Sequence, residues 1–197
     1  TAATGMDALT HAIESYITPG AWVMSDMFEL KAIEMIAQNL KAAVDNGKDV
    51  VAREAMSQAQ YIAGMGFSNV GLGIVHSMAH PLGAFYDTPH GVANALLLPY
   101  VMEYNAESPA APKYIHIAKA MGVDTTGMSE AEGVKAAVEA VKALSASINI
   151  PQKLHEINVK EEDIPALAVA AFNDVCTGGN PRPTSVADIE ALYRKAF

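Results

Sequence analysis

Apolar side chains recur along most of this chain at the three- and four-residue spacing that lines one face of a helix. The clearest stripe follows Ser25 and Asp26, either of which would cap the helix, and it stops at the turn-forming residues 45–48. Its apolar positions are Met27, Leu30, Ile33, Ile36, Leu40 and Val44. The same spacing predicts a second helix over residues 50–65.

The second half of the chain continues this pattern. Ser129 and Glu132 have the spacing of a capping box ahead of a further apolar stripe, and Pro151 closes that element. Additional helices are predicted over residues 115–121, 161–175 and 184–196. Alternating runs of β-branched residues are almost absent, so we predict an all-α, multi-helix bundle. No linker divides the sequence, and we expect residues 1–197 to form one helical domain.

Two segments interrupt the helical pattern. Residues 64–73 are rich in glycine although they lie between strongly apolar stretches, and residues 176–183 join the last two predicted helices. Glycine-rich connections of this kind occur where the backbone must pass close to a ligand, so both segments are candidate walls of a site. The alternative is that they only connect helices.

Composition narrows the classes of partner. The chain has 13 basic and 22 acidic residues, a formal net charge of −9, which argues against nucleic acid or an anionic membrane as a partner. No apolar run reaches the roughly 20 residues of a membrane-spanning helix. The single cysteine, Cys176, rules out an intramolecular disulfide and fits a reducing compartment. The first residues do not resemble a secretory signal, and we expect a cytoplasmic protein.

Histidines gather in two places that suggest metal chemistry. Asp7 and His11 are four residues apart, as are His76 and His80, so each pair lies on one face of a helix. His90 follows after a proline and a loop. Several imidazoles and a carboxylate in an apolar setting would be costly unless a divalent cation satisfied them together. One such histidine alone would more often be a hydrogen-bonded core residue.

The sequence does not match other known site motifs, and the types of donor atom indicate which metal ions the site would bind. A zincin helix needs glutamate where Ser77 stands, and Gly71 and Gly73 lack the third glycine and preceding strand of a dinucleotide-binding fingerprint. Three imidazoles with one carboxylate suit Fe²⁺, Zn²⁺ and similar ions, and are too rich in nitrogen for Ca²⁺ or Mg²⁺. Room for a substrate oxygen beside four ligands favours Fe²⁺, with Zn²⁺ as the alternative.

Five longer motifs resemble the C-terminal domain of the group III, iron-dependent alcohol dehydrogenases. They are residues 3–14 (ATGMDALTHAIE), 63–73 (AGMGFSNVGLG), 73–83 (GIVHSMAHPLG), 89–91 (PHG) and 174–182 (DVCTGGNPR). The similarity extends over essentially the whole chain. It implies an all-helical metal domain in which four positions bind the metal, namely Asp7, His11, His76 and His90.

The resemblance also implies roles around the metal. His80 would lie near the reacting centre as a proton relay, and Phe67 and Cys176 would contact the substrate. Members of the family carry an N-terminal α/β domain that holds NAD, and no such segment is present in this sequence. We therefore expect this chain to be the metal-binding half of a longer parent, inactive by itself, and the parent to be a homo-oligomer.

The resulting hypothesis is reversible hydride transfer between NAD and a short-chain alcohol or diol, with the metal activating the hydroxyl or carbonyl oxygen. Two alternatives stay open at this point. One is a helical metal-dependent hydrolase, which would need a second carboxylate cluster, and only Glu14 and Asp87 are near enough in sequence to supply it. The other is a non-enzymatic helical module with structural histidines.

Overall fold

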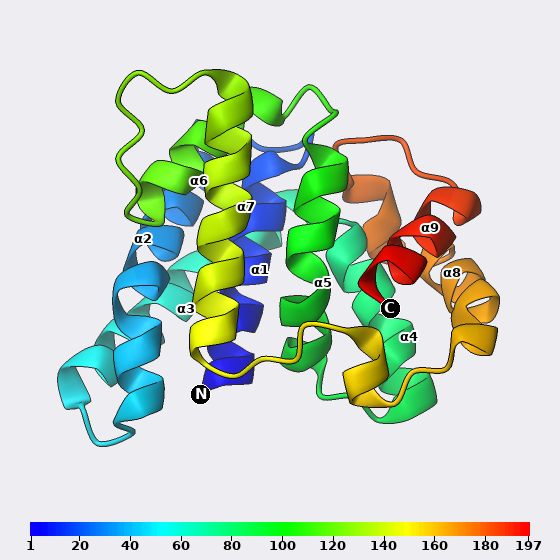
Figure 1. Cartoon of the computed structure of the whole chain (residues 1–197). Helices are drawn as coiled ribbons and strands as arrows, with labels where there is room; N and C mark the ends of the chain where they lie inside the picture. The colour runs from blue at the N-terminus through cyan, green and yellow to red at the C-terminus, as the bar shows by residue number, and fades with distance from the viewer.

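The computed structural model describes residues 1–197 as an all-helical molecule without strands, which confirms the predicted fold class (Figure 1). Its α-helices are α1 (Ala2–Ile17), α2 (Val23–Asp45), α3 (Val50–Val70), α4 (Ile74–Tyr86), α5 (His90–Asn105), α6 (Tyr114–Ala120), α7 (Glu130–Ser147), α8 (Ile164–Phe172) and α9 (Val186–Ala196). Its 3₁₀ helices are η1 (Ala111–Lys113), η2 (Leu154–Ile157), η3 (Glu161–Asp163) and η4 (Val175–Gly179). No helix is both long enough and apolar enough to cross a membrane.

Helix α1 lies at the centre of the packing. It contacts α2 and α3 on one side and α5 on the other, while α4 packs between α5 and α8 (Figure 1). One continuous cluster of 44 buried apolar residues joins these layers. Because α1 is enclosed by neighbours, its polar side chains are buried as well, and Thr10, Glu14 and Ser15 must find hydrogen-bond partners inside the protein.

Several predicted helix limits were wrong for identifiable reasons. Helix α2 begins at Val23, before the predicted cap, because Ser25 sits one turn inside the helix and accepts a hydrogen bond from the N–H of Trp22 at 3.0 Å. Helix α3 continues to Val70, so most of the glycine-rich segment is helical rather than a loop. The predicted helix over residues 161–175 begins as η3 and ends at Phe172. The Ser129–Glu132 capping box is confirmed.

Helix α5 was not predicted, because its sequence does not alternate between apolar and polar faces. Eleven of its sixteen residues are buried, including Asn94 and Asn105, so it carries little amphipathic pattern. Pro81 lies inside α4, and this helix continues five residues further to Tyr86. A kink-prone residue inside a helix is tolerated where tertiary packing holds both sides, and all of α4 from Ile74 to Ala79 is buried.

A buried carboxyl group explains the glycine of α3. Glu29 of α2 is fully buried against Gly66, where any Cβ would overlap the carboxyl group. The hydroxyl of Ser15 lies 2.5 Å from Oε1 of Glu29 and 2.5 Å from the carbonyl oxygen of His11, and its single proton cannot satisfy both oxygens. Oε2 has no partner. Burial therefore raises the pKa of Glu29 to about 8.

This carboxyl group predicts how stability changes with pH. The unfolded chain releases the Glu29 proton near pH 4.5, whereas the folded chain keeps it until about pH 8. The free energy of unfolding therefore falls as the pH rises between these two values. Glu29→Gln cannot ionise. We expect its melting temperature to equal that of the wild type near pH 5 and to exceed it by several degrees near pH 8, since one kcal/mol corresponds to about 2–4 °C.

Thermal melts of both proteins across this pH range test the prediction. Glu34→Gln is the matched control, because Glu34 lies on the same helix with a solvent-accessible side chain paired to Lys31. Parallel curves for the wild type and Glu29→Gln would show that Glu29 does not hold its proton.

Candidate metal centre

A close contact between two backbones brings two of the predicted metal ligands together. Gly91 in the first turn of α5 packs against the carbonyl oxygen of Ala3, where a Cβ would lie only 2.2 Å from that oxygen. Asp7 is one turn further along α1 than Ala3, and His90 is the first residue of α5. The absence of a side chain at position 91 therefore lets the start of α5 approach α1 closely enough for His90 to reach Asp7.

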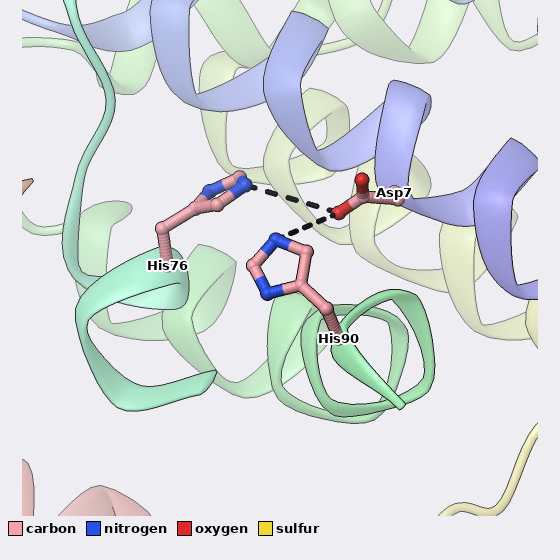
Figure 2. A group of neighbouring side chains, drawn as sticks. All are labelled: Asp7, His76 and His90. Atoms are coloured by element: carbon pink, nitrogen blue, oxygen red, sulfur yellow. Dashed lines mark ion pairs between the residues drawn. The ribbon is translucent and has the colours of Figure 1, made fainter. Parts of the chain in front are cut away.

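Three of the predicted ligands converge from three helices. Oδ1 of Asp7 on α1 lies 3.8 Å from Nε2 of His76 on α4 and 3.4 Å from Nε2 of His90 on α5 (Figure 2). One potential ligand atom from each residue lies within 4.8 Å of the others. The sequence separation of these residues shows that only the tertiary fold creates this group.

A buried carboxylate fixes the orientation of His76. Nδ1 of His76 donates a hydrogen bond to Oε2 of Glu14 at 2.6 Å, and both side chains are only 2% exposed. Oε1 of Glu14 accepts from the backbone N–H of Val75, also at 2.6 Å. With its proton on Nδ1, His76 keeps a lone pair on Nε2, and this buried atom has no hydrogen-bond partner. A lone pair left unpaired opposite a carboxylate is the donor arrangement that a divalent cation satisfies.

His11 lies beside the group of three but is not part of it. Its Nδ1 donates to the carbonyl oxygen of Asp7 at 2.7 Å, which leaves Nε2 as the atom with a lone pair. The centre of its ring is 4.3 Å from that of His76 and 4.5 Å from that of Phe67. Burial lowers the pKa of both His11 and His90, and the neighbouring His76 lowers it further. Neutral imidazole is the form that binds metals.

Asn94 is a member of the site that the sequence analysis missed. Its amide nitrogen donates to Oδ1 of Asp7 at 2.7 Å and lies 3.0 Å from Nε2 of His90. The side chain is fully buried although it is polar, one turn after His90 on α5. The spacing of four residues from a histidine was the available hint, but nothing in the sequence indicated that α5 is a helix.

The remaining predicted residues lie around this group at different depths. His80 stacks on His90 with ring centres 5.4 Å apart, and its Nδ1 is 2.7 Å from Oδ2 of Asp174. Phe67 lines a cleft of about 630 Å³ together with Asp7 and His11.

Cys176 does not line this cleft. Burial raises the pKa of its thiol to about 12, and the charge of Asp174 adds to the effect, so Cys176 is a neutral thiol and a poor nucleophile.

Comparison with known proteins identifies the family of this chain. The model of the Fe-containing alcohol dehydrogenase family, C-terminal, matches residues 1–197. Lactaldehyde reductase of Escherichia coli K12 is 60% identical over 196 residues, which cover 100% of this chain and 50% of that protein. The 1,3-propanediol dehydrogenase of Klebsiella pneumoniae is 47% identical over 197 residues, covering 100% of this chain and 51% of that protein.

The fold has solved counterparts as well. The crystal structure of a 1,3-propanediol oxidoreductase superposes with a TM-score of 0.98 at 47% identity, covering 100% of this chain and 51% of that one. The chain thus spans about half the length of the curated relatives it matches. These findings confirm the family resemblance that the motifs suggested.

The Glu14–His76 pair generates a prediction about metal affinity. Glu14→Gln keeps an oxygen for the N–H of Val75 but places an amide N–H₂ against Nδ1 of His76, which favours the proton on Nε2 and removes the lone pair from the site. We expect Co²⁺ to bind this variant of the chain about 10- to 100-fold more weakly than the wild type, as for other partners of metal-binding histidines.

Isothermal titration of the metal-free chain with Co²⁺ provides the measurement. Glu54→Gln, an exposed glutamate on α3 that bonds only Gln58, is the matched control and should bind Co²⁺ as the wild type does. Equal affinities for Glu14→Gln and the wild type would show that Glu14 does not orient a ligand.

Proposed function

The chain belongs to the Fe-containing alcohol dehydrogenase family, and from this premise we propose that residues 1–197 form the metal-binding catalytic half of an NAD-dependent oxidoreductase. The whole protein would interconvert short-chain alcohols or diols and the corresponding aldehydes by hydride transfer. The observation that carries this proposal is the unpaired, buried Nε2 of His76 opposite the carboxylate of Asp7. A purely structural histidine in this core would have both ring nitrogens satisfied.

Asp7, His11, His76 and His90 would hold the cation, with Fe²⁺ as the proposed ion and Zn²⁺ as the alternative. When bound, such an ion lowers the pKa of an alcohol hydroxyl and polarises an aldehyde carbonyl. The three imidazoles reach the site as neutral donors when their Nδ1 atoms are engaged elsewhere, as they are in His76 and His11. Asp7 contributes the negative charge, and Asn94 holds the Asp7 carboxylate in place.

His80 would move the proton that alcohol oxidation releases. Oxidation of an alcohol to an aldehyde separates a hydride, which NAD accepts, from the hydroxyl proton, which must leave the site. His80 lies at the rim of the site, because it stacks on His90 and 41% of its side chain is exposed. Phe67, which packs against His11, would provide an apolar contact for the carbon chain of the substrate. Cys176 would contact the substrate only as a neutral thiol.

The alternatives fit these contacts less well. A hydrolase with a second cation would need a free carboxylate, but both oxygens of Glu14 are occupied, by Val75 and His76. Asp87 is an exposed residue at the end of α4. For the whole protein we further propose an N-terminal dinucleotide-binding domain, assembly as a homo-oligomer and a cytoplasmic location.

The role of His80 is testable in the full-length parent protein. We expect His80→Gln to lower kcat for oxidation of a short-chain diol by about 10²-fold or more, the usual contribution of a positioned acid or base, while the metal content stays unchanged. His116→Gln is the control, because His116 is an exposed histidine on α6 that bonds Tyr16. Steady-state rates of NADH formation give the measurement. An unchanged kcat for His80→Gln would remove the relay role, and an inactive Fe²⁺-loaded wild type would contradict the proposed function.

A further inference from the structure

His80 shares the side-chain arrangement of the buried His76, but at the rim of the site. In both cases Nδ1 faces a carboxylate from a distant part of the chain, Glu14 for His76 and Asp174 for His80. Asp174 is the residue before η4, within the segment between the last two helices. Neither Glu14 nor Asp174 belongs to the group of three converging ligands.

The two oxygens of Asp174 have different partners. Oδ1 accepts from the backbone N–H of Cys176 at 2.9 Å, with the hydroxyl of Ser77 at 3.4 Å, whereas Oδ2 faces Nδ1 of His80 at 2.7 Å. Burial raises the pKa of Asp174, but the bonds from Cys176 and His80 outweigh this and hold the pKa below its usual value. The group is thus an ionised carboxylate that only accepts hydrogen bonds, and the proton between it and His80 belongs to the imidazole.

The segment that carries Asp174 is fixed independently of His80. The hydroxyl of Thr177 donates to the hydroxyl of Ser77 on α4 at 2.8 Å, and Thr18 donates to the carbonyl oxygen of Gly179 at 2.8 Å. Gly179 packs so closely on the carbonyl oxygen of Leu72 that no Cβ would fit. Asp174 is therefore held on a preformed support rather than drawn into place by the histidine.

Two contacts together determine how the ring of His80 is oriented. Stacking on His90, with an angle of 16° between the ring planes, sets the plane of the imidazole. The bond to Asp174 then selects which nitrogen points toward that carboxylate. Nε2 of His80 has no hydrogen-bond partner within the protein, and the side chain is 41% exposed.

We propose that Asp174 is a positioning residue that holds His80 in the tautomer with its proton on Nδ1 and so keeps the lone pair of Nε2 free at the rim of the site. The catalytic meaning of this arrangement rests on the proposed function. There, the substrate O–H bond breaks as an N–H bond forms at Nε2, and Asp174 stabilises the resulting imidazolium through the Nδ1 proton. The added proton then leaves from Nε2 to water, which restores the starting tautomer.

The variant Asp174→Asn tests whether Asp174 sets the tautomer of His80 or only supports the local structure. The amide has the shape of the carboxylate, and its oxygen can keep the bond from the N–H of Cys176. Its N–H₂ group then faces Nδ1 of His80, which must accept, so the proton moves to Nε2. Asp124→Asn is the matched control, since Asp124 is exposed in the loop between α6 and α7 and bonds only the nearby Thr126.

The experiment is a long-range ¹H–¹⁵N correlation spectrum of the metal-free, ¹⁵N-histidine-labelled chain at about pH 8.5, which reports which ring nitrogen of each histidine carries the proton. The His80 signals are assigned by their loss in His80→Gln. We expect the proton on Nδ1 in the wild type and in Asp124→Asn, and on Nε2 in Asp174→Asn. Unchanged His76 signals report that the site is still folded, because that histidine keeps its bond to Glu14.

Either of two results would overturn the proposal: a wild-type His80 with its proton on Nε2, or the same tautomer in the wild type and Asp174→Asn. The first needs no variant, so a folding defect in Asp174→Asn leaves the proposal falsifiable. In the full-length protein we expect Asp174→Asn to lower kcat by about 10²-fold or more with KM changed only a few-fold. Inactivity of the wild-type parent would instead refute the proposed function. It would leave the tautomer result unaffected, because the tautomer is measured without turnover.

Discussion

The hydrogen bond between Glu14 and His76 is the contact on which the centre depends. Burying a carboxylate and an imidazole is costly unless their polar atoms are satisfied, and here the cost is offset by a mutual bond at 2.6 Å and by the N–H of Val75. The bond connects the central helix α1 to the start of α4. It also leaves Nε2 of His76 unpaired and facing Asp7, and a cation bound between them would satisfy both groups.

The centre can be viewed as two histidine–carboxylate pairs at different depths. The inner pair, His76 with Glu14, is almost fully buried and prepares a ligand. The outer pair, His80 with Asp174, is partly open to solvent and stacked on the ligand candidate His90. In the proposed function a histidine–carboxylate pair serves both metal binding and proton movement. The two pairs differ in burial and in position, because Nε2 of His76 faces Asp7 whereas His80 lies at the rim.

Local patterns in the sequence predicted the helical class, several helices and the residues that gather at the centre. Asp7, His11, His76 and His90 come from short motifs, and the structure brings three of them into one group with His11 alongside. The residues that hold them were beyond such reasoning. Glu14 meets His76 across 62 positions and Asp174 meets His80 across 94, so only packing reveals them. Residues 64–70 were misjudged for a similar reason, because Gly66 makes room for a buried Glu29 on another helix.

The most direct measurement of the central claim, that this chain alone assembles a preformed metal centre, is its metal content. The chain and an Asp7→Ala, His76→Ala double variant would be purified anaerobically with Fe²⁺ and compared by elemental analysis, with circular dichroism to verify folding. The account predicts near-stoichiometric metal in the wild-type chain and its loss in the folded double variant. Absence of metal from both proteins would contradict the claim, and equal metal in both would show that the ion binds elsewhere.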